Sequence, residues 1–194
     1  MDKLICEFFR KKIIMHGNFT LKSGANSNVY INCRKLYEYP ELMKLVCTEL
    51  QKKISKTDWI CGIPNGATPF ATTLSLLTNT PQLMLRKEKK EHGLCRQIEG
   101  DYNNGDEVIL LEDVVTTGGS LEKYNKQLTE EGLVVKTKIA LINRGGVEGI
   151  ESLIPFSSLT NPTNILLSRL DKKIIWAADV NTMKKMFEDI DKYG

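Results

Sequence analysis

The order of apolar and periodic segments predicts an α/β domain, with a mostly parallel central sheet flanked by helices. Short apolar runs typical of buried strands occupy 59–63, 81–85, 106–111 and 134–142. Segments with helical periodicity stand between several of these runs, and most connections are short turns. Strands that alternate with helices in this way favour parallel pairing. At 194 residues the chain suits one domain of ordinary size with an appendage.

The N-terminal part is predicted to form a helix and then an extended segment. In residues 3–14, apolar residues recur at helical spacing, and Gly17 is expected to end the helix. Polar and apolar residues alternate in 28–33, as they do in a strand with one face in water.

Helix and strand patterns alternate from Pro40 onward. Pro40 stands where a helix can begin, and the apolar periodicity predicts that this helix ends near Lys56. The next apolar run leads into a glycine-containing turn at 64–69, which opens a helix through about Leu77. Because a helix N-terminus after a strand favours anions, an anion site is geometrically available at this turn.

Residues 86–105 break the pattern. They are rich in basic residues and glycine and have almost no apolar periodicity, so we expect a long mobile loop or a loose hairpin. Long loops in compact domains are usually lids or binding loops. A solvated charge run on the surface is the alternative interpretation. The pattern then resumes with a helix at 121–131, which Gly132 is expected to end.

The stretch from Val108 to Ser120 carries the strongest chemical signal. An apolar strand runs into two adjacent carboxylates, Glu112 and Asp113, and then into Thr-Thr-Gly-Gly-Ser at 116–120, where a helix begins. The first N–H groups of a helix lack partners and attract anions, and glycines let the backbone close on a phosphate. The two acids repel phosphate, so ribose hydroxyls or a divalent cation are their expected partners. An ordinary strand–turn–helix connection is the alternative, and a Walker loop is excluded because no Gly-Lys-Ser/Thr follows.

The polar residues at several strand ends are expected to meet. In open α/β sheets, ligands bind at the carboxyl ends of the strands. Five residues fall at such ends and predict one crevice: Asn65, Glu112, Asp113, Thr116 and Arg144.

Composition indicates a cytoplasmic protein. The net charge of +3 gives no reason to expect nucleic acid as a partner. No secretory leader opens the chain, and no apolar run approaches the roughly 18 residues that span a bilayer. The five cysteines have no CxxC spacing, so neither disulfides nor zinc is indicated, and Cys61 is expected to be a small core residue.

The Val108–Ser120 stretch resembles the phosphoribosyl pyrophosphate (PRPP) signature of type I phosphoribosyltransferases. Three further features are similar to the orotate phosphoribosyltransferase branch: the segment from Phe19 to Gly24 around Lys22, the basic segment from Arg86 to Gly93, and Arg144. The resemblance covers about residues 2–150. It implies a type I phosphoribosyltransferase-like fold with a small N-terminal hood region, in a domain that spans 1–155.

The resemblance implies transfer of the phosphoribosyl group of PRPP to orotate, which gives orotidine 5′-phosphate and pyrophosphate in pyrimidine (UMP) biosynthesis. The catalytic residues that it implies are Lys22, Lys90, His92 and Asp113. The residues implied for PRPP and pyrophosphate are Asn65, Gly66, Arg86, Lys87, Lys90, His92, Glu112, Asp113, Val114, Val115, Thr116, Thr117, Gly118, Gly119 and Ser120. Those implied for orotate are Lys22, Tyr30, Ile31, Thr116 and Arg144.

The resemblance also implies a cofactor and a partner. Mg²⁺ is expected at Glu112 and Asp113, bound directly, through water or through PRPP. In this family Lys90 and His92 reach into the neighbouring subunit's site, so a homodimer that shares the 86–100 loop is expected. Two positions depart from the family pattern: Asn65-Gly66 replaces an aromatic residue followed by lysine or threonine, and Asn143 stands where aspartate is usual.

The tail at 156–194 reads as helix, strand and helix. It resembles the very start of orotidine 5′-phosphate decarboxylase, which follows the transferase in animal-type UMP synthases, and Ala178-Asp-Val180 is part of the match. An ordinary closing strand and helix of the transferase domain is the alternative. No decarboxylase activity is expected from this chain under either interpretation.

Two other functions stay open beside orotate phosphoribosyl transfer. One is a PRPP-dependent transferase for a purine or another base, against which Lys22 and Arg144 argue. The other is a PRPP-binding regulatory protein without turnover, against which the intact basic loop argues, since binding alone does not require a clamp on the leaving group.

Overall fold

The computed structural model describes residues 2–20, 24, 26–87 and 97–160. The described chain divides into two compact units. One unit holds the described residues up to Lys35 and those from Ile154 onward, and the other holds Leu36–Leu153.

The first unit contains a helix and an antiparallel pair of strands. Its elements are α1 (Asp2–Arg10), β1 (Ile14–Thr20), β2 (Asn26–Ile31) and the short α5 (Phe156–Thr160). The predicted helix at 3–14 is wrong at its C-terminal end. Lys12 adopts a left-handed conformation with φ 55°, and the Ile13 N–H donates to the Phe8 carbonyl, 2.8 Å away. Ile14 then opens β1, where a β-branched side chain packs well. The helical periodicity extends to Ile13 because this residue is buried as well.

A six-stranded sheet has the order β5-β4-β3-β6-β7-β8, and all of it except the last two residues of β8 belongs to the second unit. β4 and β6 both pair parallel with β3, and β7 pairs parallel with β6, whereas the short β5 runs antiparallel to β4. The sheet is therefore mostly parallel, as predicted. Its strands are β3 (Trp59–Gly62), β4 (Gln82–Leu85), β5 (Ile98–Glu99), β6 (Glu107–Val115), β7 (Val134–Asn143) and β8 (Glu151–Pro155).

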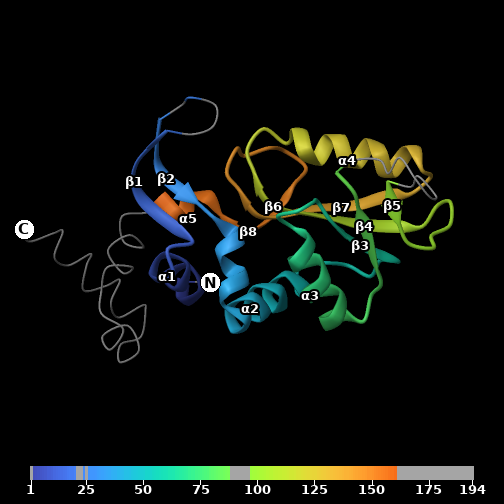
Figure 1. Cartoon of the computed structure of the whole chain (residues 1–194), viewed down its shortest axis with the longest axis horizontal. Helices are drawn as coiled ribbons and strands as arrows, with labels where there is room; N and C mark the ends of the chain where they lie inside the picture. Colours follow the sequence, from blue (N-terminus) through green and yellow to red (C-terminus); the bar gives the residue numbers. More distant parts are fainter. Residues whose placement is uncertain (1, 21–23, 25, 88–96, 161–194) are drawn as a thin grey trace, which may run out of the picture. The chain divides into compact units, whose positions relative to one another are not determined.

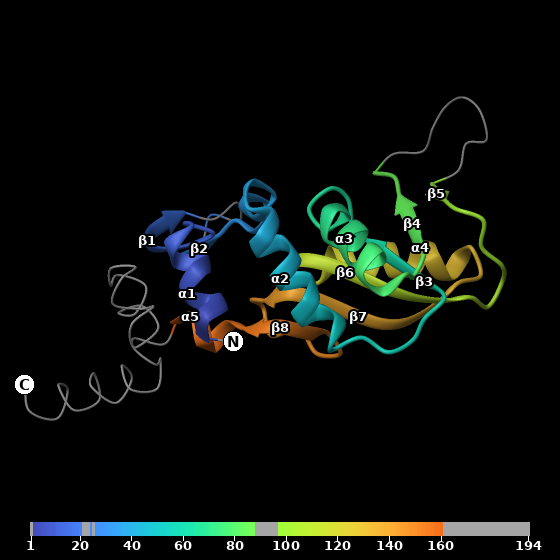
Figure 2. The same cartoon turned by 90° about the horizontal axis from the view of Figure 1, so that it is seen from below.

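Helices cover both faces of this sheet. Figures 1 and 2 show α4 on one face and α2 and α3 on the other. The helical elements are the 3₁₀ helix η1 (Cys33–Glu38), α2 (Pro40–Gln51), α3 (Thr68–Thr78) and α4 (Gly119–Glu130). The α/β class predicted from the alternation of segments is thereby confirmed.

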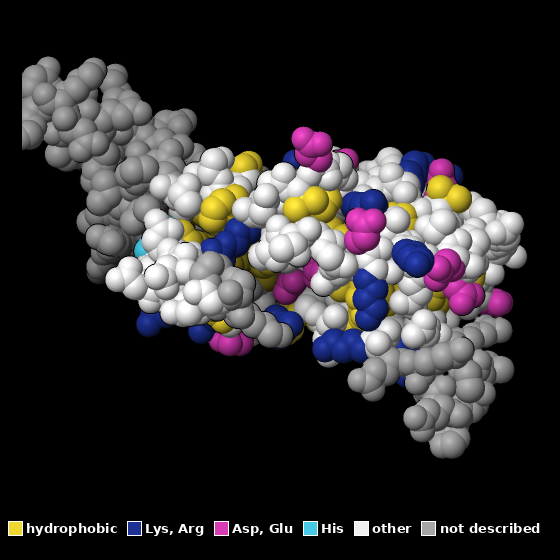
Figure 3. Space-filling model, turned by 90° about the horizontal axis from the view of Figure 1, so that it is seen from above, with side chains coloured by type: hydrophobic (Ala, Val, Ile, Leu, Met, Phe, Trp, Pro, Cys, Tyr) yellow, Lys and Arg dark blue, Asp and Glu magenta, His cyan; other side chains and the backbone are white. Residues whose placement is uncertain are grey.

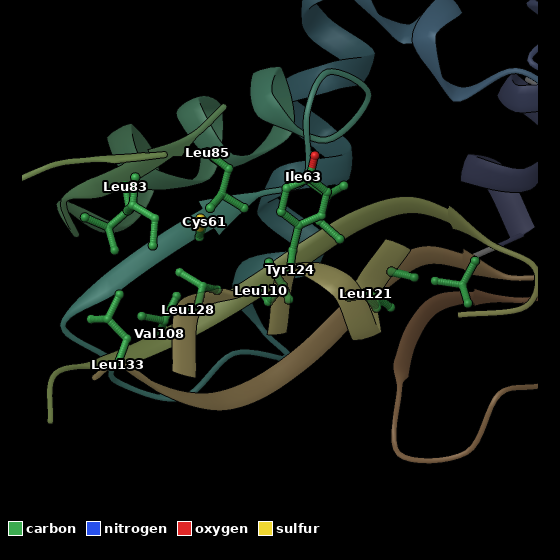
Figure 4. Packing of buried hydrophobic residues seen from close by; sticks show 13 residues of the cluster. Cys61, Ile63, Leu83, Leu85, Val108, Leu110, Leu121, Tyr124, Leu128 and Leu133 are labelled. Atoms are coloured by element: carbon green, nitrogen blue, oxygen red, sulfur yellow. The ribbon is translucent and has the colours of Figure 1, made fainter. Parts of the chain in front are cut away.

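The core between α4 and the sheet is a continuous apolar cluster. Tyr124 and Leu128 of α4 pack with Val108 and Leu110 of β6 (Figure 4). Cys61 of β3 is fully buried in the same cluster, and burial raises the pKa of its thiol to about 12. The prediction of Cys61 as a small core residue is confirmed.

Some predicted boundaries differ from the observed ones. α2 ends at Gln51 instead of near Lys56, because the lysines that follow are exposed and the Lys53 N–H turns back to the Leu50 carbonyl at 2.9 Å. β6 continues four residues beyond the predicted strand at 106–111, since its last residues, Val114 and Val115, still pair with β7. The strand β8 was not predicted at all.

The surface carries charges of both signs. On the face seen in Figure 3, the Lys and Arg side chains of the described residues are interspersed with Asp and Glu. Within the described part of the chain, no helix combines the length and the apolar character that crossing a membrane requires.

Candidate active site

The N-terminus of α4 forms an open cradle. Gly118 precedes the helix with a left-handed φ of 80°, and no side chain of the described residues caps it. The first N–H groups of the helix are therefore left to a ligand, and the helix dipole favours an anion there. A hollow of about 230 Å³, solvent space included, is lined by Glu112, Val114, Val115, Thr116, Thr117, Gly118, Gly119, Ser120 and Leu121.

The two acids of β6 lie on opposite faces of the sheet, because neighbouring side chains of a strand alternate. Glu112 shares the α4 face with Leu110 and is only 8% exposed. Burial and, after it, the charge of Glu112 raise the pKa of the Tyr124 phenol in α4. Glu112 is thus the acid that borders the cradle from the α4 side.

Asp113 faces the turn that follows β3. A Cβ placed on Gly66 would lie 2.5 Å from the Asp113 Oδ2 atom, so only glycine leaves room for this carboxylate. The other carboxylate oxygen of Asp113 accepts the Val114 N–H at 2.8 Å. The residue before the turn is tied to the middle of β6, since the Ile63 N–H donates to the Leu111 carbonyl at 2.9 Å. Gly66 and Asp113, which lie 47 positions apart in the sequence, are therefore neighbours.

The loop after β7 lies against the other side of the cradle. The N–H groups of Arg144 and Gly145 both donate to the Val115 carbonyl, at 2.9 and 3.2 Å. A Cβ on Gly145 would lie 1.6 Å from the Thr116 carbonyl oxygen, so the two backbones touch. Arg144 is half-buried at this point.

Asn143 closes the same loop. Its Nδ2 donates to the Val147 carbonyl at 2.8 Å, and its Oδ1 accepts the Val147 N–H at 3.0 Å. An ionised aspartate accepts hydrogen bonds but donates none, so it could make only the second of these contacts. The departure from the family pattern at this position therefore has a structural role in this chain.

Arg86, which follows β4, forms an ion pair that the sequence did not reveal. Its Nε donates to the Glu99 Oε1 atom at 2.6 Å, across the β4–β5 hairpin. The Arg86 N–H also donates to the Gln97 carbonyl at 2.9 Å. The described ends of the basic segment are therefore joined, and residues 88–96 between them lie outside the described residues. Lys87 is exposed.

The structure brings one set of predicted residues together. These residues all lie at the carboxyl ends of parallel strands. Asn65 and Gly66 follow β3, Glu112 to Ser120 belong to β6 and the cradle, and Arg144 follows β7. Tyr30 and Ile31 lie on β2 in the other unit, where the Tyr30 ring is 5.4 Å from Phe19. Lys22, Lys90 and His92 lie outside the described residues.

The chain is similar to named orotate phosphoribosyltransferases. No protein-family model matches it. It is 37% identical over 174 residues to orotate phosphoribosyltransferase from Thermococcus kodakarensis, covering 87% of this chain and 94% of the relative. It is also 32% identical over 196 residues to uridine 5′-monophosphate synthase from Bos taurus, covering 97% of this chain and 41% of that protein.

A solved structure agrees with these relatives. The crystal structure of orotate phosphoribosyltransferase from Aeropyrum pernix superimposes with a TM-score of 0.70 and 28% identity, over 80% of this chain and 95% of the other. The cradle after β6 and the acids before it agree with a likeness that covers 94% of the Thermococcus kodakarensis enzyme and 95% of the Aeropyrum pernix chain. This chain belongs to the orotate phosphoribosyltransferase family.

Proposed function

We propose that this chain transfers the phosphoribosyl group of PRPP to orotate, giving orotidine 5′-phosphate and pyrophosphate in pyrimidine biosynthesis. The observation that carries the proposal is the uncapped N-terminus of α4, set directly after a strand that ends in two acids. A sugar phosphate needs donors for the phosphate and acceptors for the hydroxyls, and this strand–helix junction offers both.

The reaction assigns a task to each part of the site. The bond from the anomeric carbon to the diphosphate breaks, and a bond to a ring nitrogen of orotate forms. Positive charge develops on the sugar and negative charge on the leaving group. The N–H groups at 116–120 hold the 5′-phosphate, while Glu112 and Asp113 hold the ribose hydroxyls. The base is held by Lys22, Tyr30, Ile31, Thr116 and Arg144, and pyrophosphate by Asn65, Gly66, Arg86, Lys87, Lys90 and His92.

Magnesium fits this set of donors. Glu112 and Asp113 offer the oxygen ligands that Mg²⁺ prefers, and Mg²⁺ commonly takes one or two carboxylates together with substrate phosphates. Among the described residues there is no group of three or more His, Cys, Asp or Glu that would form an all-protein cage. From the chemistry of these two carboxylates, we propose that Mg²⁺ binds at them together with PRPP; when bound, it would supply charge that stabilises the diphosphate.

An assay of the purified protein tests the function. With Mg²⁺, PRPP and orotate, we expect orotate absorbance to fall as orotidine 5′-phosphate and pyrophosphate form. Turnover with a purine that orotate does not inhibit would instead support a transferase for another base. Binding of PRPP without turnover of any base would support the regulatory alternative.

We further propose a homodimer in which the 86–100 loop is shared, and a cytoplasmic location. Lys90→Ala is expected to lower kcat by about a hundredfold, with a much smaller effect on PRPP binding, because its charge matters most as the diphosphate leaves. A shared loop predicts that inactive Lys90→Ala and Asp113→Asn chains regain activity when unfolded together and refolded as mixed dimers. Each variant refolded alone is the control, and mixtures as inactive as these controls would contradict the sharing.

The tail beyond Pro155 stays a proposal too. The match to the bovine synthase extends over 97% of this chain, against 87% for the orotate phosphoribosyltransferase from Thermococcus kodakarensis. This difference supports a tail, 156–194, that corresponds to the start of a decarboxylase-like region. The absence of decarboxylase activity stays a prediction, which release of CO₂ from orotidine 5′-phosphate would contradict.

A further inference from the structure

We infer that Tyr37 is a positioning residue for the pyrophosphate turn at 64–67. This inference rests on the proposed function of that turn. The Tyr37 hydroxyl of η1 donates to the Gly66 carbonyl oxygen, 29 residues further along the chain. The Tyr37 ring also packs against Phe70 of α3, with ring centroids 5.8 Å apart. Tyr37 therefore reaches the turn from an element that nothing in the proposed site includes.

The hydrogen bond fixes one peptide group of the turn from both sides. The carbonyl of the Gly66–Ala67 peptide accepts from Tyr37, and its N–H donates to the Ile63 carbonyl at 3.0 Å. The backbone of the turn cannot rotate about this peptide without breaking one of the two bonds. The conformation of the turn thus depends on a phenol that is itself anchored on Phe70.

The turn also borders Asp113, the acid proposed to contact the ribose. Gly66 approaches Asp113 so closely that an added Cβ would lie 2.5 Å from the carboxylate. A small shift of the turn therefore changes both the placement of its own backbone toward pyrophosphate and the room left for Asp113. The Tyr37 side chain is 40% exposed, but the contact of its ring with Phe70 already limits its freedom, which lowers the entropy cost of holding the turn through the hydroxyl.

The substitution Tyr37→Phe removes the hydroxyl and keeps the ring on Phe70. In the reverse reaction, we expect KM for pyrophosphate to rise about three- to tenfold, which is the range for loss of one net hydrogen bond. KM for orotidine 5′-phosphate should stay as in the unaltered protein, and the melting temperature should fall by only about 2–5 °C, the loss expected for one hydrogen bond in a domain of this size. A general loss of stability would not separate the two substrates in this way.

The substitution Tyr102→Phe is the matched control. It removes a hydroxyl that donates to the Glu131 carboxylate at 3.2 Å, away from the proposed site. Neither KM should change in this variant. The inference is overturned if Tyr37→Phe leaves KM for pyrophosphate unchanged, or if it raises both KM values equally.

Turnover tests the proposed function, and pyrophosphate binding tests the role of Tyr37 separately. If the unaltered protein shows no turnover, the function fails, and calorimetric titration with pyrophosphate decides the role of Tyr37. Weaker binding by Tyr37→Phe than by the unaltered protein and Tyr102→Phe would support the inference. Equal binding by all three proteins, or binding by none, would overturn it.

Discussion

Replacing Asp113 by asparagine is expected to lower kcat/KM for PRPP by about a hundredfold to a thousandfold, the range for loss of one preorganised electrostatic contact. The side chain keeps its shape, and its Oδ1 can still accept the Val114 N–H. The negative charge that we propose to contact ribose hydroxyls and Mg²⁺ is lost. The measurement is steady-state kinetics with PRPP varied at saturating orotate and Mg²⁺.

Asp106→Asn is the control for this substitution. Asp106 precedes the same strand at its opposite end, where its carboxylate accepts from the Trp59 indole at 2.9 Å and from the Asn103 N–H at 2.9 Å. These bonds, with the Asn103 N–H first, lower the pKa of Asp106, so its charge serves the local fold. Kinetics with PRPP should be unchanged in this variant. Equal losses in Asp106→Asn and Asp113→Asn would mean that the charge at 113 has no special role.

The variant Gly145→Ala is expected to lower kcat/KM for PRPP by about a hundredfold, because a displacement of about 1 Å at a site can cost that much. The added Cβ would lie 1.6 Å from the Thr116 carbonyl oxygen, so the loop after β7 and the cradle must move apart. The N–H groups that we propose to bind the phosphate then lose their alignment. Kinetics, with PRPP binding measured by calorimetry, reports this loss.

The neighbouring glycine supplies the comparison. Gly146 has a left-handed φ of 63°, but an added Cβ there meets nothing within 4 Å. Gly146→Ala should cost about 1–2 kcal/mol of folding stability through backbone strain, and it should leave kcat/KM for PRPP within a few-fold. A loss of activity in Gly146→Ala as large as in Gly145→Ala would show that loop strain, and not the contact with Thr116, explains the effect.

Local sequence patterns predicted the sheet and the cradle well. The apolar runs became β3, β4, β6 and β7, and Gly118 and Gly119 stand where α4 begins. These features depend on residues close in sequence, such as an apolar run followed by glycines, so the chain order reveals them. The family resemblance added the substrates, which no local pattern contains.

Features that depend on distant pairs were missed. The Glu99 partner of Arg86 follows from a hairpin register, and the contact between Tyr37 and Gly66 follows from the packing of η1 beside α3. The predicted end of the first helix was wrong because Ile13 is buried although it lies beyond α1, just as a residue on the inner face of a helix would be. Periodicity reports burial, and burial alone does not distinguish these two cases.

Glu112 and Asp113 point to opposite faces of the sheet, so packing changes on one face are expected to affect one acid and not the other. Repacking beneath α4, for example at Leu128, is expected to act on Glu112, whereas repacking beneath α3, for example at Leu74, is expected to act on Asp113 through the turn at Gly66. We expect the effects of the two changes on turnover to add, and a double-mutant cycle measures any coupling between them. Each of the two acids proposed to hold the ribose could thus be adjusted from its own face of the sheet.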